Sequence, residues 1–440
     1  MRFREHAINT LKLALPVAIG QLGHVMLGVI DSMMIGQVGA THLAAASLVN
    51  GLFFLILIFG IGVSTAVTPL VAIAKGGGNE DNCGIILRQS LLVNLSIAFM
   101  LMAASYFMGD LIYYMDQPPE VALLAESYMK IISFSIIPFM VFQTYRQFVE
   151  GLSLTTPPMY IAIGANFINA AVNYIFIYGK LGFPRLELDG AGYATLLTRT
   201  SMALVLVIYV FSNKSLKKYD PTLRFRNINT RIIKKILNIG VPSGLQYFFE
   251  VSAFSFSAIM IGWIGKNELA AHQIAINLAS ITYMMILGIG VAGSIRVGTF
   301  LGAGDKKNTR KAGLSALGVA MMFMGFFGVV FILFREQLPY LYNHNPEVVE
   351  YAVSLIIVAA FFQLSDGVQA VGQNILRGLT DVKIPMILSF ISYWLVGVSV
   401  GYLLGFHYGM GVVGVWIGLL VGLTVTAIFF TIRFRIKTAH

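Results

Sequence analysis

Residues 34–45 read MIGQVGATHLAA and residues 260–271 read MIGWIGKNELAA, so Met-Ile-Gly, a second Gly and Leu-Ala-Ala recur in the same order and at the same spacing. The offset that aligns these two segments also aligns further prolines and glycines: Pro16 with Pro242, Gly62 with Gly288, Gly76 with Gly302, and Gly78 with Gly304. Apolar segments resemble one another by composition, but prolines and glycines in fixed register do not arise in that way. The chain therefore consists of two related halves.

The composition places these halves in a membrane. Of the 440 residues, 57% are hydrophobic and only 11% are charged, whereas a soluble domain has about 25% charged residues. A spanning helix needs about 20 mainly apolar residues. We expect an all-α membrane protein with twelve transmembrane helices, over 13–35, 47–74, 86–108, 128–149, 158–179, 190–212, 237–263, 273–298, 312–334, 350–373, 384–405 and 411–433. Prolines 16, 69, 138 and 242 inside these spans are tolerated where neighbouring helices satisfy the freed backbone groups.

The distribution of positive charge predicts the orientation. With both termini in the cytoplasm, all but six of the 30 Lys and Arg residues fall on the cytoplasmic side, as the positive-inside rule requires. The exceptions are Lys130, Lys180, Arg185, Arg199, Lys266 and Arg335. The net charge of +10 is thus explained by topology, and we expect the basic segments to contact anionic membrane lipid rather than nucleic acid.

Six spans in each half bring both halves into the membrane from the same side, related by an axis along the membrane normal. We expect an N-terminal six-helix lobe at 1–212, a basic cytoplasmic linker at 213–235 and a C-terminal six-helix lobe at 236–440. Two pseudo-symmetric lobes suit alternating access, in which one lobe rocks against the other around a central site. The architecture therefore favours a solute transporter over a channel or an intramembrane enzyme.

Three carboxylates lie deep in the predicted spans, namely Asp31, Glu250 and Asp366, whereas the other acidic residues fall in loops or near span ends. A charge at the centre of a bilayer costs at least about 2.5–3.5 kcal/mol, so it tends to mark a functional site. Burial favours the protonated form of a carboxyl group, which lets it load and release a proton. The ionised group with neighbouring amide and hydroxyl oxygens can instead hold a hard cation such as Na⁺. The sequence leaves both mechanisms open.

Polar side chains accompany each carboxylate. In the N-terminal half they are Gln21, His24, Asn169, Asn173, Thr195, Thr198 and Arg199; in the C-terminal half they are Gln246, Ser257, Thr282, Tyr283, Gln369 and Gln373. Each either contributes to a binding site or only hydrogen-bonds a neighbouring helix. For Arg199 the alternatives are an ion pair with Asp31 and extension to the membrane interface.

Several motifs resemble those of multidrug and toxic compound extrusion (MATE) transporters, and the likeness covers nearly the whole chain. The motifs are Asp31-Ser32-Met33-Met34-Ile35-Gly36, Leu43-Ala44-Ala45, the loop Gly76-Gly77-Gly78-Asn79, Glu150-Gly151-Leu152 and the intramembrane Glu250. In having both Glu250 and Asp366, the chain resembles the NorM-type branch of that family.

The resemblance implies a cation-coupled antiporter, not an enzyme, that exports amphipathic and often cationic drugs and dyes. It implies one cation site at Glu250, Tyr283 and Asp366, and a second at Asp31, Asn169, Asn173 and Thr195. The coupling ion would be H⁺, or Na⁺ held at Glu250, Asp366 or Asp31, with no cofactor. We further expect a monomer in a bacterial inner membrane.

The substrate pathway is expected to include Gln246, Phe249, Phe254, Phe362 and Gln369, because aromatic faces attract flat cations. Some members of the family have a tyrosine one turn before the span-ten aspartate, where this chain has Phe362. A hydroxyl ligand is therefore missing at that position.

A flippase for lipid-linked oligosaccharides is the alternative function, and a receptor or scaffold without transport is a third class. The flippase would favour several intramembrane cations facing a central cavity, and Arg199 is the one candidate that the sequence offers. A non-transporting protein would leave three buried carboxylates unexplained. The balance favours drug export.

Overall fold

The computed structural model describes residues 2–221 and 228–439 and is almost entirely helical. Within these residues, twelve helical segments are long and apolar enough to cross a membrane, which confirms the predicted number of spans. They are α1 (Phe3–Gly36), α2–α3 (Ala40–Ser64, Val67–Gly76), α4 (Glu80–Leu111, extended by η1, Ile112–Tyr114), α5–α6 (Pro119–Phe134, Ile136–Gly151), α7 (Thr156–Tyr178), α8 (Glu187–Ser212), α9 (Thr230–Ile264), α10 (Lys266–Gly302), α11 (Lys306–Leu333), α12 (Pro346–Gly378), α13–η5 (Lys383–His407) and α15 (Gly411–Lys437).

The chain packs as two compact units. The N-terminal unit is Ile19–Gly244, and the C-terminal unit combines the residues up to Ala18 with those from Leu245 onward. Both divisions fall inside a helix, the first after Ala18 of α1 and the second after Gly244 of α9, and the offset of the internal repeat aligns these two positions. The predicted lobes at 1–212 and 236–440 describe the repeat rather than this packing, and they stay a prediction.

Two spans of the N-terminal unit are broken by small hydroxyl residues. Thr65 separates α2 from α3 together with Ala66, and Ser135 separates α5 from α6. The hydroxyl of Thr65 donates to the carbonyl of Gly62 at 2.6 Å, and that of Ser135 to the carbonyl of Ile132 at 2.5 Å, so each competes with the helical ladder. Prolines 69 and 138 consequently lie in the first turn of a new helix, where a missing N–H costs little. The sequence analysis placed both prolines inside spans, but neither lies within a continuous helix.

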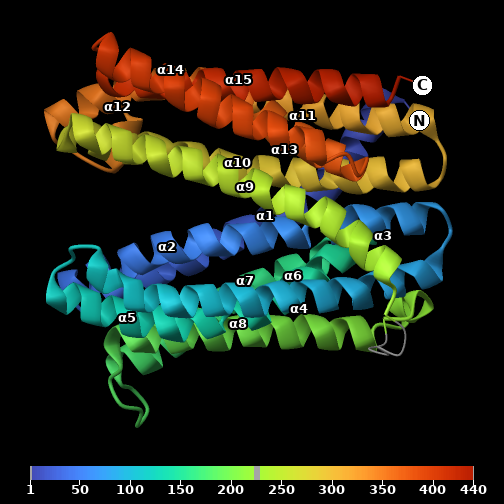
Figure 1. Ribbon diagram of the computed structural model, residues 1–440, viewed down its shortest axis with the longest axis horizontal. Helices are drawn as coiled ribbons and strands as arrows, with labels where there is room; N and C mark the ends of the chain where they lie inside the picture. The colour runs from blue at the N-terminus through green and yellow to red at the C-terminus, as the bar shows by residue number, and fades with distance from the viewer. Residues whose placement is uncertain (1, 222–227, 440) are drawn as a thin grey trace. The chain divides into compact units, whose positions relative to one another are not determined.

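In the C-terminal unit, α10, α11, α12 and α15 pack side by side (Figure 1). The beginning of α1 packs against this group: the Nη2 of Arg296 on α10 lies 2.7 Å from the Nδ1 of His6, whose Nε2 lies 3.0 Å from the Oδ1 of Asn308 on α11. Span eleven is not a regular α-helix. It contains two π-helical segments, η4 (Ile391–Val398) and η5 (Leu403–His407), on either side of α14 (Ser399–Tyr402).

The predicted basic linker lies partly outside the described residues, namely at Arg224 and Arg226. Before them, η2 (Lys214–Tyr219) holds three lysines, and after them Arg231, Lys234 and Lys235 belong to α9. Lys218 donates to Glu80 at 2.7 Å, and this hydrogen bond raises the pKa of Lys218. The segment is therefore attached to the start of α4.

The stability of the C-terminal unit should depend on a close contact between two helices at a glycine. A Cβ atom on Gly418 of α15 would overlap the backbone nitrogen of Gly401 and the carbonyl oxygen of Gly397, whereas one on Gly164 of α7 would meet nothing within 4 Å. We expect Gly418→Ala to cost about 1–3 kcal/mol through overpacking and Gly164→Ala to cost much less. Thermal unfolding in detergent, followed by tryptophan fluorescence, measures both. Equal melting midpoints for the two variants would refute this account of the contact.

Candidate functional site

The predicted N-terminal site assembles around Asp31 on α1. Its Oδ1 accepts a hydrogen bond of 2.6 Å from the amide nitrogen of Asn173, and its Oδ2 accepts one of 3.2 Å from the hydroxyl of Thr195. The Asn173 nitrogen also donates to the Oδ1 of Asn169 at 3.1 Å. Asp31 is only 7% exposed. The four residues that the sequence grouped thus lie together, contributed by α1, α7 and α8.

Arg199, one turn after Thr195 on α8, has a different partner from either that the sequence offered. Its guanidinium donates to the hydroxyl oxygen of Ser135 at 2.8 Å. Its Cζ lies 5.3 Å from the ring centroid of Phe53 and 4.9 Å from that of Phe139. The positive charge is therefore held between two aromatic rings at the break between α5 and α6.

The predicted C-terminal site centres on Glu250 of α9. The hydroxyl of Tyr283 on α10 donates to its Oε1 at 3.3 Å, and the amide nitrogen of Gln369 on α12 donates to its Oε2 at 3.4 Å. Both bonds are longer than those to Asp31. Gln369 also donates to the Oε1 of Gln373 at 3.2 Å.

Asp366 shares this site but lacks such donors. Its side chain is 4% exposed and close enough to Glu250 for the two charges to interact. Within residues 2–221 and 228–439, no side chain forms a hydrogen bond or ion pair with its carboxylate. Two acidic groups with few donors favour the uptake of a proton or of a cation.

The residues expected along the substrate pathway have varied surroundings. Gln246 donates to Ser389 at 3.0 Å, Phe249 lies 5.0 Å from the ring of Phe390, and Phe254 lies edge-on to Phe362 at 6.0 Å. Phe362 is 2% exposed and packs against Trp416. The sequence did not reveal a neighbouring pair, Thr282 and Gln363, which exchange hydrogen bonds of 2.8 and 3.0 Å across α10 and α12.

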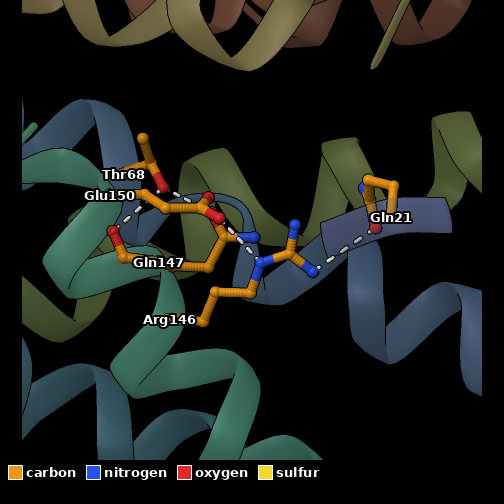
Figure 2. A network of polar contacts seen from close by, with 5 residues as sticks. All are labelled: Gln21, Thr68, Arg146, Gln147 and Glu150. Atoms are coloured by element: carbon orange, nitrogen blue, oxygen red, sulfur yellow. Dashed lines mark hydrogen bonds and ion pairs between the residues drawn. The ribbon is translucent and has the colours of Figure 1, made fainter. Parts of the chain in front are cut away.

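A second buried charge cluster near the end of α6 was missed by the sequence analysis. Figure 2 shows the guanidinium of Arg146 between the carboxylate of Glu150 and the amide of Gln21. The Nε of Arg146 lies 2.7 Å from the Oε1 of Glu150, and its Nη1 donates to Gln21 at 3.4 Å. In the same network Thr68 of α3 hydrogen-bonds Gln147. The spacing of four between Arg146 and Glu150 could have signalled the pair.

Arg199 is not the one arginine among the spanning helices, and it is only partly buried. Arg146, Arg296 and Arg377 are buried, which corrects the expectation from the sequence. Arg146 pairs with Glu150, Arg296 donates to Thr10 at 2.8 Å, and Arg377 donates to Asn374 at 3.1 Å and lies 5.2 Å from the ring centroid of Tyr247. Each is thus engaged by side chains of its own unit.

The comparisons with known proteins agree on one family. A family model described as MatE matches residues 16–175 and 242–403, two segments whose first residues, Pro16 and Pro242, are aligned by the internal repeat. Multidrug resistance protein NorM of Photobacterium profundum is 36% identical over 437 residues, which cover 98% of this chain and 96% of that protein. Multidrug resistance protein MdtK of Yersinia pseudotuberculosis is 36% identical over 439 residues, covering 99% and 96%.

A solved structure matches in fold. The crystal structure of the eukaryotic MATE transporter AtDTX14 has a TM-score of 0.90 at 21% identity, and the match covers 99% of this chain and 98% of that one.

The Arg146–Glu150 pair should contribute to stability only as a pair. We expect Arg146→Met to cost about 3–5 kcal/mol, because it leaves the buried Glu150 carboxylate without its partner, and the double variant Arg146→Met/Glu150→Met to cost much less. Thermal unfolding of the two single variants and the double variant measures the coupling. The exposed pair Lys218–Glu80, also at 2.7 Å, is the matched control, at about 0–1 kcal/mol. Additive losses at 146 and 150 would contradict this role.

Proposed function

The chain belongs to the MatE family, and from this premise we propose that it is a multidrug efflux transporter that exchanges H⁺ or Na⁺ for amphipathic, often cationic drugs and dyes. It is a multi-pass protein of a bacterial membrane. We propose that both termini lie in the cytoplasm, that it works as a monomer and that its two lobes alternate access to the substrate. The relatives named above carry multidrug resistance in their names, and this supports the choice of cargo.

The observation that carries the proposal is the pair of donor-poor carboxylates, Glu250 and Asp366, inside a bundle of apolar helices. An acidic group in that surrounding is costly unless it binds a proton or a cation. Binding of the coupling ion would remove negative charge from the unit and so favour release of a cationic drug. Return of the ion-loaded protein would then exchange the ion for new substrate. In this scheme the ion and the drug compete for the negative charge of Glu250 and Asp366, and this competition couples their transport.

The ligands available suit either coupling ion. The carboxylates of Glu250 and Asp366, the Tyr283 hydroxyl and the amide oxygen of Gln373 are all oxygen ligands, which hard cations prefer, whereas Gln369 turns its amide nitrogen toward Glu250. The described residues contain no group of three His, Cys, Asp or Glu side chains that would favour a transition metal. A proton needs only one of the carboxylate oxygens.

A lipid flippase is less favoured. It would need cations free to bind an anionic headgroup, whereas Arg146 is paired with Glu150 and Arg199 is held by Ser135 and two rings. Reconstituted protein separates the two functions: a flippase moves labelled lipid between the leaflets, whereas the drug antiporter moves dye across the membrane.

The carboxylates should be required for coupled efflux. We expect Glu250→Gln and Asp366→Asn each to lower gradient-driven dye transport in proteoliposomes about tenfold or more, because an amide neither carries a negative charge nor takes up a proton near neutral pH. Glu350→Gln, an exposed acid on the same helix as Asp366, is the control and should retain transport. A pH gradient and a Na⁺ gradient imposed separately identify the coupling ion. Full transport by both site variants would sink this assignment.

The Tyr283 hydroxyl should tune ion affinity without being essential. Tyr283→Phe keeps the ring but removes the donor to Glu250. We expect the concentration of the coupling ion at half-maximal transport to change about two- to tenfold, the range of one hydrogen bond, with the maximal rate retained. An unchanged ion dependence would exclude the hydroxyl from the site.

A further inference from the structure

Arg377, near the end of α12, places a buried positive charge in the same unit as Glu250. Its side chain is 2% exposed. Its Nη1 donates to the Oδ1 of Asn374 at 3.1 Å, and its Cζ lies 5.2 Å from the ring centroid of Tyr247 on α9. A guanidinium over an aromatic face is attracted by the negative charge of that face. These contacts hold the charge at a defined place between α9 and α12.

Two contacts join α9 and α12 here, one at the carboxylate and one at the arginine. Gln369 of α12 donates to Glu250 of α9, and Arg377 of α12 lies over Tyr247 of α9. Tyr247 and Glu250 are three residues apart, and Gln369, Gln373 and Arg377 follow one another at intervals of four, so neighbours in each series share a helical face. The arginine therefore faces the same helix as the site, about two turns of α12 beyond Gln369.

The connection between the two charges is made by buried amides. The nitrogen of Gln369 donates both to Glu250 at 3.4 Å and to the Oε1 of Gln373 at 3.2 Å. Gln369 and Gln373 are themselves buried. The charges of Arg377 and Glu250 interact, and an interaction through a buried, mainly apolar region is screened much less than one through water.

A fixed cation at this distance opposes the binding of a second one. It stabilises the ionised form of the carboxylate, and it repels a proton or a Na⁺ ion that would add positive charge to the site. The sign is the same for both candidate ions. Burial acts in the other direction, because two acids in an apolar bundle gain from taking up positive charge. The affinity of the site for its ion is the balance of the two effects.

Transport needs that balance, because an ion that binds must also leave in every cycle. Differences in affinity among related sites arise mostly from the rate of release. A pair of buried acids without an opposing charge would release its ion slowly. The end of α12 faces the cytoplasm in the proposed topology, so Arg377 lies toward the side on which an inward-moving ion is released.

Packing offers a different explanation for a buried arginine at this place. A Cβ atom on the next residue, Gly378, would lie 2.8 Å from the carbonyl oxygen of Ser294, so α12 ends in close contact with α10. Arg377 would then serve only to fix the end of the helix. This explanation predicts a loss of folded protein on substitution and no change in ion affinity, and the two roles are therefore separable.

We propose that Arg377 is a positioning residue for ion coupling, which weakens the binding of the coupling ion at Glu250 and Asp366 enough for the ion to be released in each cycle. The inference rests on the proposed function and deepens it. It assigns to one arginine the task of setting how tightly the C-terminal unit holds its ion.

The test measures ethidium transport in proteoliposomes, with Na⁺ varied at fixed pH and with pH varied in choline. For the ion that drives the wild type, Arg377→Gln should lower the half-saturating concentration about tenfold, the range for two charges on neighbouring helices, and should lower the maximal rate. Arg377→Lys keeps the charge and should stay within about threefold of the wild type. Arg296→Gln alters another buried arginine of this unit and should leave the half-saturating concentration unchanged.

A second variant tests the same field in the opposite direction and does not depend on the folding of Arg377→Gln. Gln373→Lys adds a cation one turn closer to Gln369, the donor to Glu250, and should raise the half-saturating concentration about tenfold or more. Gln373→Met, which is neutral and of similar size, is the matched control and should change it much less. Size exclusion in detergent establishes that each variant is folded.

An unchanged half-saturating concentration in folded Arg377→Gln, with only the rate or the amount of protein reduced, would show a structural role and overturn the inference. So would a shift in Arg377→Lys as large as that in Arg377→Gln, or no shift in Gln373→Lys. Failure of the proposed function is distinct, since it appears as absence of gradient-driven ethidium flux in the wild type. Ion binding to the same variants can then still be followed by tryptophan fluorescence, because all three tryptophans lie in this unit.

Discussion

The cost of placing charge in an apolar bundle is the constraint on which this structure depends. A buried ion must be paired, must be hydrogen-bonded, or must change its state. Arg146 meets the first condition through Glu150, and Arg199 meets the second through Ser135 and two aromatic rings. Asp366 meets neither within the described residues. Among the described residues, Asp366 is therefore a place where this requirement is not met, and we propose that an external ion binds there.

The internal repeat adds to this contrast, because the two halves share glycines and prolines in register but differ in the polar and charged residues at aligned positions. In the register that aligns Pro16 with Pro242, His24 corresponds to Glu250 and Asp31 to Ser257. In the register that aligns Gly151 with Gly378, Phe139 corresponds to Asp366 and Glu150 to Arg377. No intramembrane carboxylate has a carboxylate at the related position. The ring that holds Arg199 in one unit thus occupies the place of the acid in the other. Duplication preserved the glycines and prolines that set helix contacts, and the polar positions diverged between the halves.

The sequence predicted the features that depend on one helix at a time. Span length and the depth of Asp31, Glu250 and Asp366 follow from hydropathy alone, and the family resemblance implied the grouping of Asp31 with Asn173 and Thr195. The breaks at Thr65 and Ser135 did not, because a hydroxyl bonded to a carbonyl three residues back leaves no mark in hydropathy. The surroundings of Arg199 combine α2, α6 and α8, so no periodicity within a single span could reveal them. Glu150 was assigned to a span end, yet it is 1% exposed.

These differences bear on how an ion gradient can be coupled to export. A site whose charge is already balanced gains little from binding an ion and loses little on releasing it, so it can follow the substrate rather than drive it. A site with two acids and few donors differs strongly in free energy between its empty and loaded states, and a ligand can shift a conformational equilibrium only by such a difference. We propose that Glu250 and Asp366 supply that difference in the C-terminal unit.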